Sequence, residues 1–378
     1  MKILITTDWY VPAVNGVVTS VLNLEKELRK KGHEVKILTL SQNRHSHVSG
    51  HVTYIGSVGA GKIYPNARVR IAVRSKYVTE IMEWQPDIIH SQCEFSTFLY
   101  ARHIAKVLNI PIVHTYHTVY EDYTHYFSPF GIIGKKAVRT FSRWCADSCE
   151  VIIVPTEKVK ELLESYGIDA EIQVIPSGIN LDKFNPKRIE KDCLRNEISG
   201  ISEEDFVCVY IGRLAKEKNI DELITMHHDM KEPNVKLLIV GDGPDRENLE
   251  KLVEKYGMTD CVIFTGMVSP KDIEKYYKLG DVFVSGSTSE TQGLTYVEAL
   301  ASGLPVVCRQ DKCLDGVIED HFNGYQYTDS EEYQKWIFML LKDAEFRETM
   351  SYNALLSSKK FGSDCFVNAV EELYETKL

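Results

Sequence analysis

The sequence contains no apolar run long enough to cross a membrane, because nowhere do 18 or more apolar residues follow one another. Its first residues, MKILITTDWY, also lack the apolar segment of a secretory signal peptide. We therefore expect a protein that stays in the cytoplasm.

Several short motifs are also missing. The nine cysteines include no Cys-x-x-Cys pair, so we expect reduced thiols rather than a zinc or redox site. The loop after the first predicted strand reads DWYVPAVNG and lacks Gly-x-Gly-x-x-Gly, and the later VGDGP has Arg246 where a third glycine would stand. The signal for a nicotinamide dinucleotide is therefore weak.

The negative net charge is unevenly divided. The chain has 44 basic and 54 acidic residues. Residues 1–175 contain 20 basic and 17 acidic residues, a net charge of +3. The remaining residues contain 24 basic and 37 acidic residues, a net charge of −13. An acidic chain argues against nucleic acid as the main partner. A locally basic first half is compatible with an anionic surface as a partner.

Strands and helices alternate along the chain, which is typical of an α/β, doubly wound sheet. A length of 378 residues favours two domains, and we place them at residues 1–175 and 176–360, with the linker in EIQVIPSGINLDKFN. In the first half we expect strands at 2–7, 34–40, 52–55, 87–91, 110–115 and 151–154, and helices at 17–31, 69–83, 95–108 and 156–166. In the second half we expect strands at 206–212, 235–240, 262–265 and 281–284, and helices at 220–230, 245–256, 270–278, 294–302 and throughout 331–378.

The stretch SGSTSETQGLTYVEALASGLP combines a strand end, a polar loop and a helix start with two carboxylates, Glu290 and Glu298. Backbone amides near Gly293 and Leu294 could hold a phosphate, because a helix N-terminus carries unpaired N–H groups and partial positive charge. Carboxylates beside such an anion site suit the hydroxyls of a sugar or ribose. The alternative is that both glutamates are solvated acids near a helix start.

The segment YIGRLAKEKN places Gly212 at a strand end, with Arg213 and Lys218 in the loop that follows. Cations at the carboxyl end of a strand can receive a diphosphate. A solvated charged loop is the alternative.

Both segments resemble motifs of the retaining glycosyltransferases of family four: the first its E-x7-E segment, the second its G-R-L-x-x-E-K motif. The resemblance implies the GT-B fold, with two Rossmann-like domains facing across a cleft and a last helix, 361–378, that returns to the first domain. It also implies a nucleotide-sugar donor whose phosphates meet Arg213 and Lys218, with Gly16 approaching the donor diphosphate or the acceptor and the region around Val268 packing the base. No Asp-x-Asp occurs, so we expect metal-independent transfer without a cofactor.

The first half contains HTYHTVYEDYTHY directly after a predicted strand. A lone histidine is more often structural than catalytic. The position of His117, however, resembles that of the family's active-site histidine, which contacts the sugar. Acceptor-side candidates are Tyr10, Tyr120, Tyr123 and His125, and for the last three ordinary packing is the equal alternative.

The segment IIGKKAVRTFSRWC is predicted to be a helix with Lys135, Lys136, Arg139 and Arg143 on one side and an apolar side that includes Phe141 and Trp144. Such a helix can lie at a membrane interface, where each cation near anionic lipid contributes on the order of 1 kcal/mol. A second basic cluster, Arg68, Arg70, Arg74 and Lys76, points the same way. The alternative is an ordinary surface helix whose apolar side packs on the sheet.

The segment around His117 is also similar to that of bacterial diacylglycerol glucosyltransferases, which make monoglucosyldiacylglycerol. The leading hypothesis is therefore a peripheral enzyme on the inner face of the cell membrane that transfers glucose from UDP-glucose to diacylglycerol with an α linkage. A soluble glycosyltransferase of the same family acting on a saccharide or small molecule is the second. A sugar-nucleotide-binding protein without transfer activity, or a GT-B epimerase, is the third.

Overall fold

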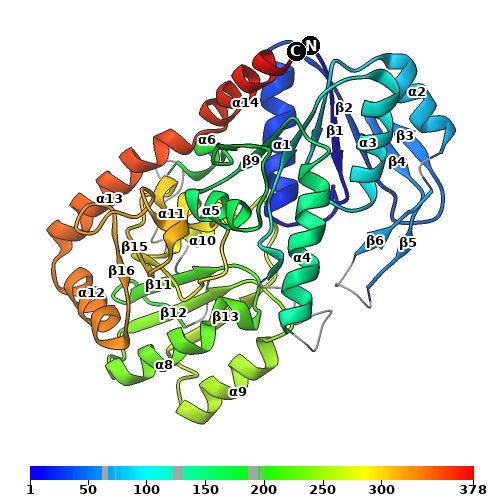
Figure 1. The fold of residues 1–378 in the computed structure, drawn as a ribbon. Helices are drawn as coiled ribbons and strands as arrows, with labels where there is room; N and C mark the ends of the chain where they lie inside the picture. The colour runs from blue at the N-terminus through cyan, green and yellow to red at the C-terminus, as the bar shows by residue number, and fades with distance from the viewer. Residues whose placement is uncertain (62–66, 73, 122–130, 186–194, 196–197, 199) are drawn as a thin grey trace. The chain divides into compact units, whose positions relative to one another are not determined.

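The computed structural model describes all residues except 62–66, 73, 122–130, 186–194, 196–197 and 199 (Figure 1). The chain forms two compact units, one made of Met1–Gly178 together with Ser363–Leu378 and the other of Ile179–Gly362. The linker predicted in EIQVIPSGINLDKFN contains the point at which the first unit ends.

The first unit is built on a sheet in which the described strands follow the order β10-β9-β8-β7-β1-β2-β4-β3. All neighbours are parallel except β3 and β4. Every residue of β7, β8 and β9 is buried, as expected for a parallel sheet covered on both faces. The strands are β1 (Lys2–Thr7), β2 (Glu34–Leu40), β3 (His47–Ser49), β4 (Val52–Ile55), β7 (Ile88–Ser91), β8 (Ile112–Thr115), β9 (Val151–Val154) and β10 (Glu171–Val174).

The helices of the first unit include one that comes from the far end of the sequence. Helix α14 packs against α1 (Figure 1), and its Val370 and Tyr374 lie in the same apolar core as Ile3 and Leu24. The expected return of the last helix to the first domain is therefore confirmed. The helices are α1 (Gly16–Lys30), α2 (Lys76–Trp84), α3 (Ser96–Leu108), α4 (Gly131–Ala146), α5 (Glu157–Ser165) and α14 (Ser363–Lys377).

The helix predicted over 69–83 is wrong at its start. Residues Arg68–Val69 form β6, which pairs with β5 (Val58–Gly59), and the backbone N–H of Arg70 donates to Ser96 Oγ at 2.9 Å. These contacts hold the chain extended, and the helix begins only at Lys76, after an extended Ser75.

The second unit contains a parallel sheet in which the described strands follow the order β13-β12-β11-β14-β15-β16. Strands β15 and β16 were not predicted. The segment 331–378, predicted to be helical throughout, is interrupted at Asp343 and at Gly362. The elements are β11 (Phe206–Ile211), β12 (Val235–Val240), β13 (Val262–Gly266), β14 (Val282–Ser285), β15 (Val306–Arg309), β16 (Gly324–Tyr327), α6 (Leu181–Phe184), α8 (Ile220–Met230), α9 (Arg246–Tyr256), α10 (Ile273–Leu279), α11 (Leu294–Ala301), α12 (Ser330–Lys342), α13 (Ala344–Ser358), and the short 3₁₀ turns η3 (Lys216–Lys218), η4 (Lys312–Leu314) and η5 (Lys359–Phe361).

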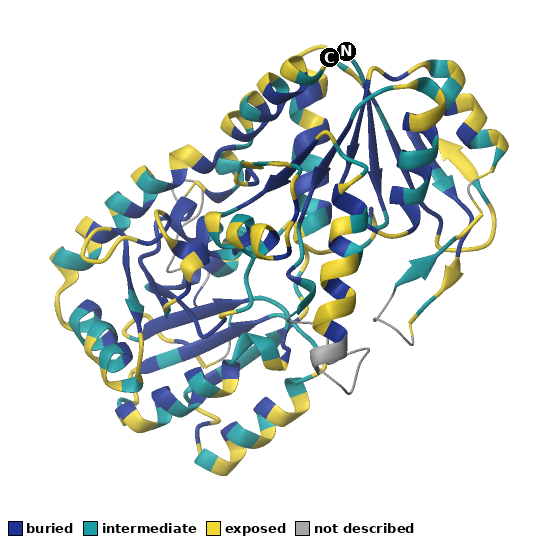
Figure 2. Ribbon diagram, viewed as in Figure 1, coloured by how far each residue is buried: buried dark blue, intermediate teal, exposed yellow. Residues whose placement is uncertain are grey.

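Alternate residues of β11 enter different apolar cores. Val207 and Val209 lie in the core that contains α11, whereas Cys208 and Tyr210 lie in the core that contains residues of α8 and α12. In Figure 2 most of this sheet is accordingly buried, with the edge strand β13 less so, while the outward sides of the helices are exposed. Packing on both faces fixes the strand that carries the Arg213 loop.

Glycine at position 241 allows the loop after β12 to pack against the loop after β11. A Cβ on Gly241 would lie 2.0 Å from the carbonyl oxygen of Gly212, and Gly241 has φ of +134°, which non-glycine residues rarely adopt. The N–H of Leu214 donates to Asp242 O at 3.0 Å. The glycines of VGDGP are therefore explained by packing of two loops.

We predict that Gly241→Ala lowers the free energy of unfolding by about 3 kcal/mol or more, because it combines a backbone clash with a strained φ. The matched control is Gly257→Ala, since Gly257 also has a positive φ, +67°, but has open space where its Cβ would lie. That variant should lose only about 1 kcal/mol. Urea unfolding of both measures the difference, and equal losses would contradict the packing argument.

Candidate active site

In the second unit, the order in which the chain adds strands to the sheet reverses between β11 and β14. From β11 the chain continues to β12 and β13 on one side, and from β14 it continues to β15 and β16 on the other. In open parallel sheets, ligands bind at the carboxyl ends of the strands where the order reverses. The loops that leave β11 and β14 are the loops in which the sequence placed its candidates.

The loop after β11 contains Arg213 and Lys218. Tyr210 anchors it from the strand, because the Tyr210 hydroxyl donates to the carbonyl oxygen of Arg213 at 3.1 Å. The turn η3 then ends at Asn219, which has φ of 49° and starts α8. Asn219 Nδ2 donates to Gly286 O at 3.0 Å and so joins this loop to the loop after β14.

The loop after β14 is held from below by Tyr296 of α11. The Tyr296 hydroxyl donates to Ser285 Oγ at 2.8 Å, and its ring lies under Gly293, where a Cβ would come within 2.4 Å of Cδ2. Gly293 also has φ of +74°, which favours glycine. These contacts fix the turn at the N-terminus of α11.

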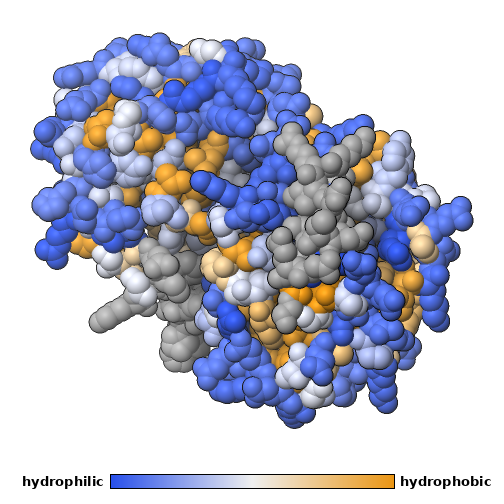
Figure 3. All heavy atoms as spheres, turned by 180° about the vertical axis from the view of Figure 1, so that it is seen from behind, coloured by the Kyte–Doolittle hydropathy of each residue, from blue (hydrophilic) through white to orange (hydrophobic). Residues whose placement is uncertain are grey.

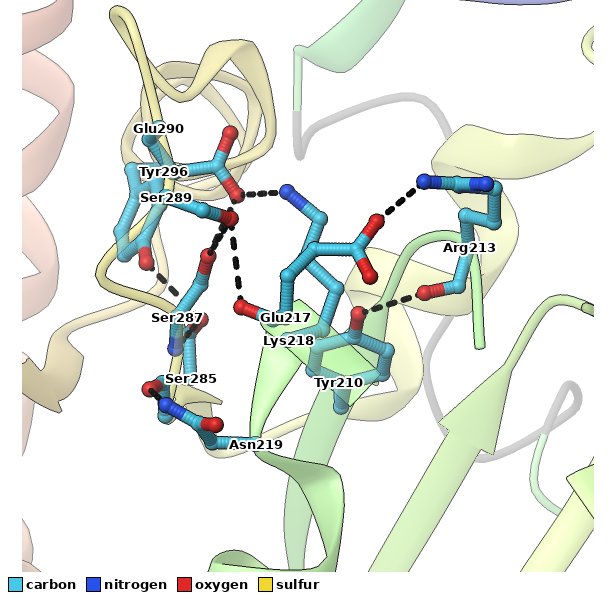
Figure 4. Close-up of polar contacts among 11 residues, drawn as sticks. Tyr210, Arg213, Glu217, Lys218, Asn219, Ser285, Ser287, Ser289, Glu290 and Tyr296 are labelled. Carbon is cyan, nitrogen blue, oxygen red and sulfur yellow. Dashed lines mark hydrogen bonds and ion pairs between the residues drawn. The ribbon is translucent and has the colours of Figure 1, made fainter. Parts of the chain in front are cut away.

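The two loops meet through side chains (Figure 4). Lys218 Nζ lies 2.5 Å from Glu290 Oε1, and Ser287 Oγ donates to the same oxygen at 2.9 Å. Ser289 Oγ donates to the backbone oxygen of Glu217 at 3.1 Å. The structure therefore brings the predicted Lys218 and Glu290 together. We call Arg213, Glu217, Lys218, Ser287 and Glu290 the switch-point site.

Both cations of the switch-point site have a carboxylate neighbour. Arg213 pairs with Glu217, and Lys218 with Glu290, and the two basic side chains are 31% and 14% exposed. Cations held near solvent at the end of a sheet can bind phosphate oxygens, and the first turn of α11, whose N-cap Gly293 offers no side chain, supplies further N–H donors at Leu294.

Glu298 lies one turn into α11. Its Oε2 accepts from the Tyr277 hydroxyl at 2.7 Å, and burial raises the pKa of Glu298 above its ordinary value. The remaining oxygen could accept a hydroxyl. Gly212 lies beside the Tyr210 ring, as expected at the strand end.

The end of β13 presents the residues predicted to pack a base. Val268 is partly buried against the apolar core, while the neighbouring Met267 is 72% exposed. Met267 lies within the segment Gly266–Val268 that the family resemblance assigned to the base. An exposed, flexible apolar side chain at a strand's carboxyl end is a suitable contact for a planar ring.

In the first unit, the order in which the chain adds strands reverses between β1 and β7. His117 follows β8, and its Nε2 lies 2.7 Å from Gln92 Oε1, after β7. Burial lowers the pKa of His117 to about 3, so the imidazole is neutral at physiological pH. A neutral ring donates through one nitrogen and accepts through the other.

Further buried polar groups lie at the same edge of this sheet, and among them sequence reasoning missed Asp8, Gln92 and Glu94. Asp8 Oδ1 accepts from the Thr97 N–H at 2.9 Å at the start of α3, whereas Asp8 Oδ2 is buried without a partner among the described residues. Glu94 accepts from the Tyr120 hydroxyl and lies 3.3 Å from His114 Nε2. Their position after β1 and β7 was the available signal. We call Asp8, Gln92, Glu94, His114 and His117 the polar cluster of the first unit.

The remaining first-unit candidates have different environments. Tyr10 is 8% exposed and its hydroxyl donates to Glu25 Oε2 at 2.9 Å, which favours a packing role over acceptor contact. Gly16 is an exposed first residue of α1, whose N-terminus is capped by Asn15. Tyr123 and His125 lie outside the described residues.

Helix α4 packs as the surface-helix alternative describes. Val138 lies in an apolar core, and the half-buried rings of Phe141 and Trp144 stack together, with Phe95 against the first and Phe98 against the second. On the basic side, Lys135 and Arg139 lie 3.3 and 3.4 Å from the carboxylate of Glu121. Arg143 donates to Gly167 O at 3.1 Å and Lys136 is exposed.

The described residues contain neither a membrane-spanning helix nor a cluster of metal ligands. No helix there has the length and apolarity to span a bilayer. No group of three or more His, Cys, Asp or Glu side chains in that part of the chain is arranged to hold a metal ion. The face shown in Figure 3 is largely hydrophilic, with apolar patches between polar side chains.

Comparison with protein-family models gives two matches. Residues 14–183 match the model described as Glycosyltransferase Family 4, and residues 195–356 match the model described as Glycosyl transferases group 1.

Two relatives carry the name alpha-monoglucosyldiacylglycerol synthase. The protein from Acholeplasma laidlawii is 34% identical over 99% of this chain and 96% of its own length. The protein from Streptococcus pneumoniae is 39% identical over 86% of this chain and 75% of its own. Among solved structures, Anabaena HepE in complex with UDP-glucose has a TM-score of 0.78 at 19% identity, with both chains fully covered. WaaG, a glycosyltransferase of lipopolysaccharide biosynthesis, has a TM-score of 0.73 at 16% identity over 98% and 99% of the chains. The fold is GT-B, as expected from the motifs.

The polar cluster of the first unit leads to a prediction about pH. Burial, with a smaller contribution from Glu94, raises the pKa of Asp8 from 3.8 to about 7. Between these values the folded protein retains a proton that the unfolded chain has lost, so this group's contribution to stability falls as pH rises from about 4 to about 7.

Asp8→Asn should remove this trend while keeping the oxygen that caps α3. We expect the stability of the wild type relative to the variant to fall by on the order of 1 kcal/mol per pH unit over that range and to stay level above it. Urea unfolding at a series of pH values measures it. A difference that does not change with pH would refute the assignment.

Proposed function

Because the chain belongs to the family-four glycosyltransferases, we propose that it transfers a hexose, with glucose favoured, from a UDP-sugar to diacylglycerol. The product would be an α-glycosyl diacylglycerol, formed with retention at the sugar carbon. The enzyme would act from the cytoplasm, bound to the inner face of the cell membrane.

The main support for transfer chemistry is the contact between Lys218 and Glu290, which lies where the strand order of the second sheet reverses. Transfer from a nucleotide sugar leaves negative charge on the departing diphosphate, and cations and helix N-termini placed at that charge lower the barrier. Arg213, Lys218 and the first amides of α11 are the groups proposed for this role. With them in place we propose that no metal ion is required.

The carboxylates have a second proposed role. Glu290 and Glu298 would accept hydrogen bonds from the hydroxyls of the sugar and the ribose, since ionised carboxylates are strong acceptors. His117, neutral because of burial, would contact a hydroxyl of the transferred sugar. The acceptor would be deprotonated with the help of the leaving phosphate in a front-face displacement.

The proposed acceptor is supported by the two relatives named for a glucosyldiacylglycerol product, at 34% and 39% identity. UDP-glucose is the first donor to test, because HepE, which shares the fold, was solved in complex with UDP-glucose. Helix α4 and the basic residues before α2 are the proposed contacts with anionic lipid.

One observation favours a second candidate function, transfer to a soluble saccharide or small molecule. The apolar side of α4 packs inside its own unit, and two of its cations share Glu121. Such a helix contributes less to membrane binding than four unpaired cations and a free apolar face would.

Transfer is tested by incubating the protein with a panel of nucleotide sugars and dispersed diacylglycerol, and by reading product and linkage by NMR. We predict α-glucosyl diacylglycerol from UDP-glucose, unaffected by EDTA. Arg213→Ala and Glu290→Ala should lower kcat/KM by about 100- to 1000-fold with little change in stability, because each removes a group that acts on the transition state.

The matched control is Glu247→Gln, which removes a charge from the exposed pair with Lys251. Retained turnover in either active-site variant would contradict the assigned roles. Hydrolysis or epimerisation without transfer would instead support a sugar-nucleotide-binding protein or an epimerase.

Membrane binding is tested by sedimentation with vesicles of neutral lipid, with and without anionic lipid. Changing Lys135, Lys136, Arg139 and Arg143 together to serine should weaken binding to anionic vesicles by about tenfold or more, since each cation near the surface contributes on the order of 1 kcal/mol. The control changes four exposed lysines of the second unit to serine: Lys251, Lys255, Lys271 and Lys335. If both quadruple variants are fully active although neither binds vesicles, a soluble acceptor is favoured over diacylglycerol.

A further inference from the structure

Glu217 has no role in the function proposed above, although it lies inside the switch-point site. Its Oε1 accepts a hydrogen bond from Arg213 Nη2, and its side chain is 8% exposed. Its Oε2 is buried and has no hydrogen-bond partner among the described residues. Figure 4 shows the carboxylate between Arg213 and the chain of Lys218.

A buried carboxylate oxygen without a partner is unfavourable, because water that solvated it in the unfolded chain has not been replaced. Its presence next to Arg213 therefore calls for an explanation other than stability. A phosphate that binds Arg213 must share the guanidinium with Glu217 or displace it, because the two side chains already form an ion pair.

The shape of the loop depends on other contacts. The Tyr210 hydroxyl binds the carbonyl oxygen of Arg213, and the N–H of Leu214 binds Asp242 O. Ser289 holds Glu217 through its backbone oxygen and not through the carboxylate. Loss of the negative charge at Glu217 should therefore leave the backbone of the Arg213 loop in place.

The two ligands that such a site meets differ in charge. In a sugar nucleotide each phosphate carries one negative charge, whereas the terminal phosphate of a free nucleoside diphosphate ionises a second time with a pKa near 6. Above neutral pH the product therefore carries about one more negative charge than the donor, and that charge lies on the phosphate that loses the sugar.

We propose that Glu217 is a specificity-determining residue that weakens the binding of free nucleoside diphosphate more than that of the sugar nucleotide. The fixed carboxylate repels both ligands, and it repels the more highly charged product more strongly. The product nucleoside diphosphate therefore dissociates more readily, and it competes less with the donor for the switch-point site. This role rests on the proposed function, because it assumes a nucleotide-sugar donor at the switch-point site.

The test is calorimetric titration of the full-length protein with UDP and with UDP-glucose at pH 8. In Glu217→Gln we expect the Kd for UDP to fall about tenfold and the Kd for UDP-glucose about threefold, because a like charge close to the phosphates is gone. The surface control Glu247→Gln, which removes a charge far from this loop in the sequence, should stay within about twofold of the wild type.

Other results would overturn the role. Weaker binding of both ligands to Glu217→Gln would show that Glu217 orients Arg213, and an equal gain for both would show competition without discrimination. If the glutamine variant does not fold, Glu217→Ser removes the same charge and is subject to the same criteria. A wild type that binds neither ligand would overturn the proposed function itself, whereas a wild type that binds both while Glu217→Gln binds them unchanged would overturn only this inference.

Discussion

The candidate chemistry of this protein depends on the adjacency of β11 and β14 in one parallel sheet. Parallel strands deliver all their carboxyl ends to one edge, and the loops after neighbouring strands separate only where the chain reverses its order. Because β11 and β14 are neighbours at that reversal, loops 72 residues apart in sequence can place Lys218 against Glu290. The apolar cores on both faces of β11 keep the strand, and with it the cations, from moving.

In the first unit, a reversal of strand order also brings side chains from separate loops together, but these side chains are of a different chemical kind. There the reversal between β1 and β7 gathers Asp8, Gln92 and Glu94, and β8 adds His117. Burial favours the neutral forms of Asp8 and His117, as the raised pKa of Asp8 and the lowered pKa of His117 indicate. One unit therefore presents the cations Arg213 and Lys218, and the other presents buried hydrogen-bonding groups, of which Asp8 and His117 favour the neutral form.

Local sequence patterns were sufficient to locate many of the strands and the motif residues of the second unit. The apolar strands and the motif residues Arg213, Lys218 and Glu290 could be read from the sequence because each lies where a strand ends. Contacts between distant segments could not be read in the same way. Arg70 is held extended by Ser96, and Asp8 is recognised as part of a cluster only when β1 and β7 lie side by side. The amphipathic pattern of α4 was correct, but the pattern does not say whether Phe141 meets lipid or Phe95.

The chain enters the second unit at Ile179 and leaves it at Gly362, and these two residues form a β-bridge, with the Ile179 N–H bound to Phe361 O at 2.9 Å. The unit is thus a continuous cassette whose ends already touch, inserted before the final helix of its host. Genetic exchange could replace such a cassette in a single event without breaking a strand, so that the switch-point site would change while the polar cluster of the first unit stayed as it was. Shortening the gene at its 3′ end, by contrast, would strip a core helix from the half encoded first.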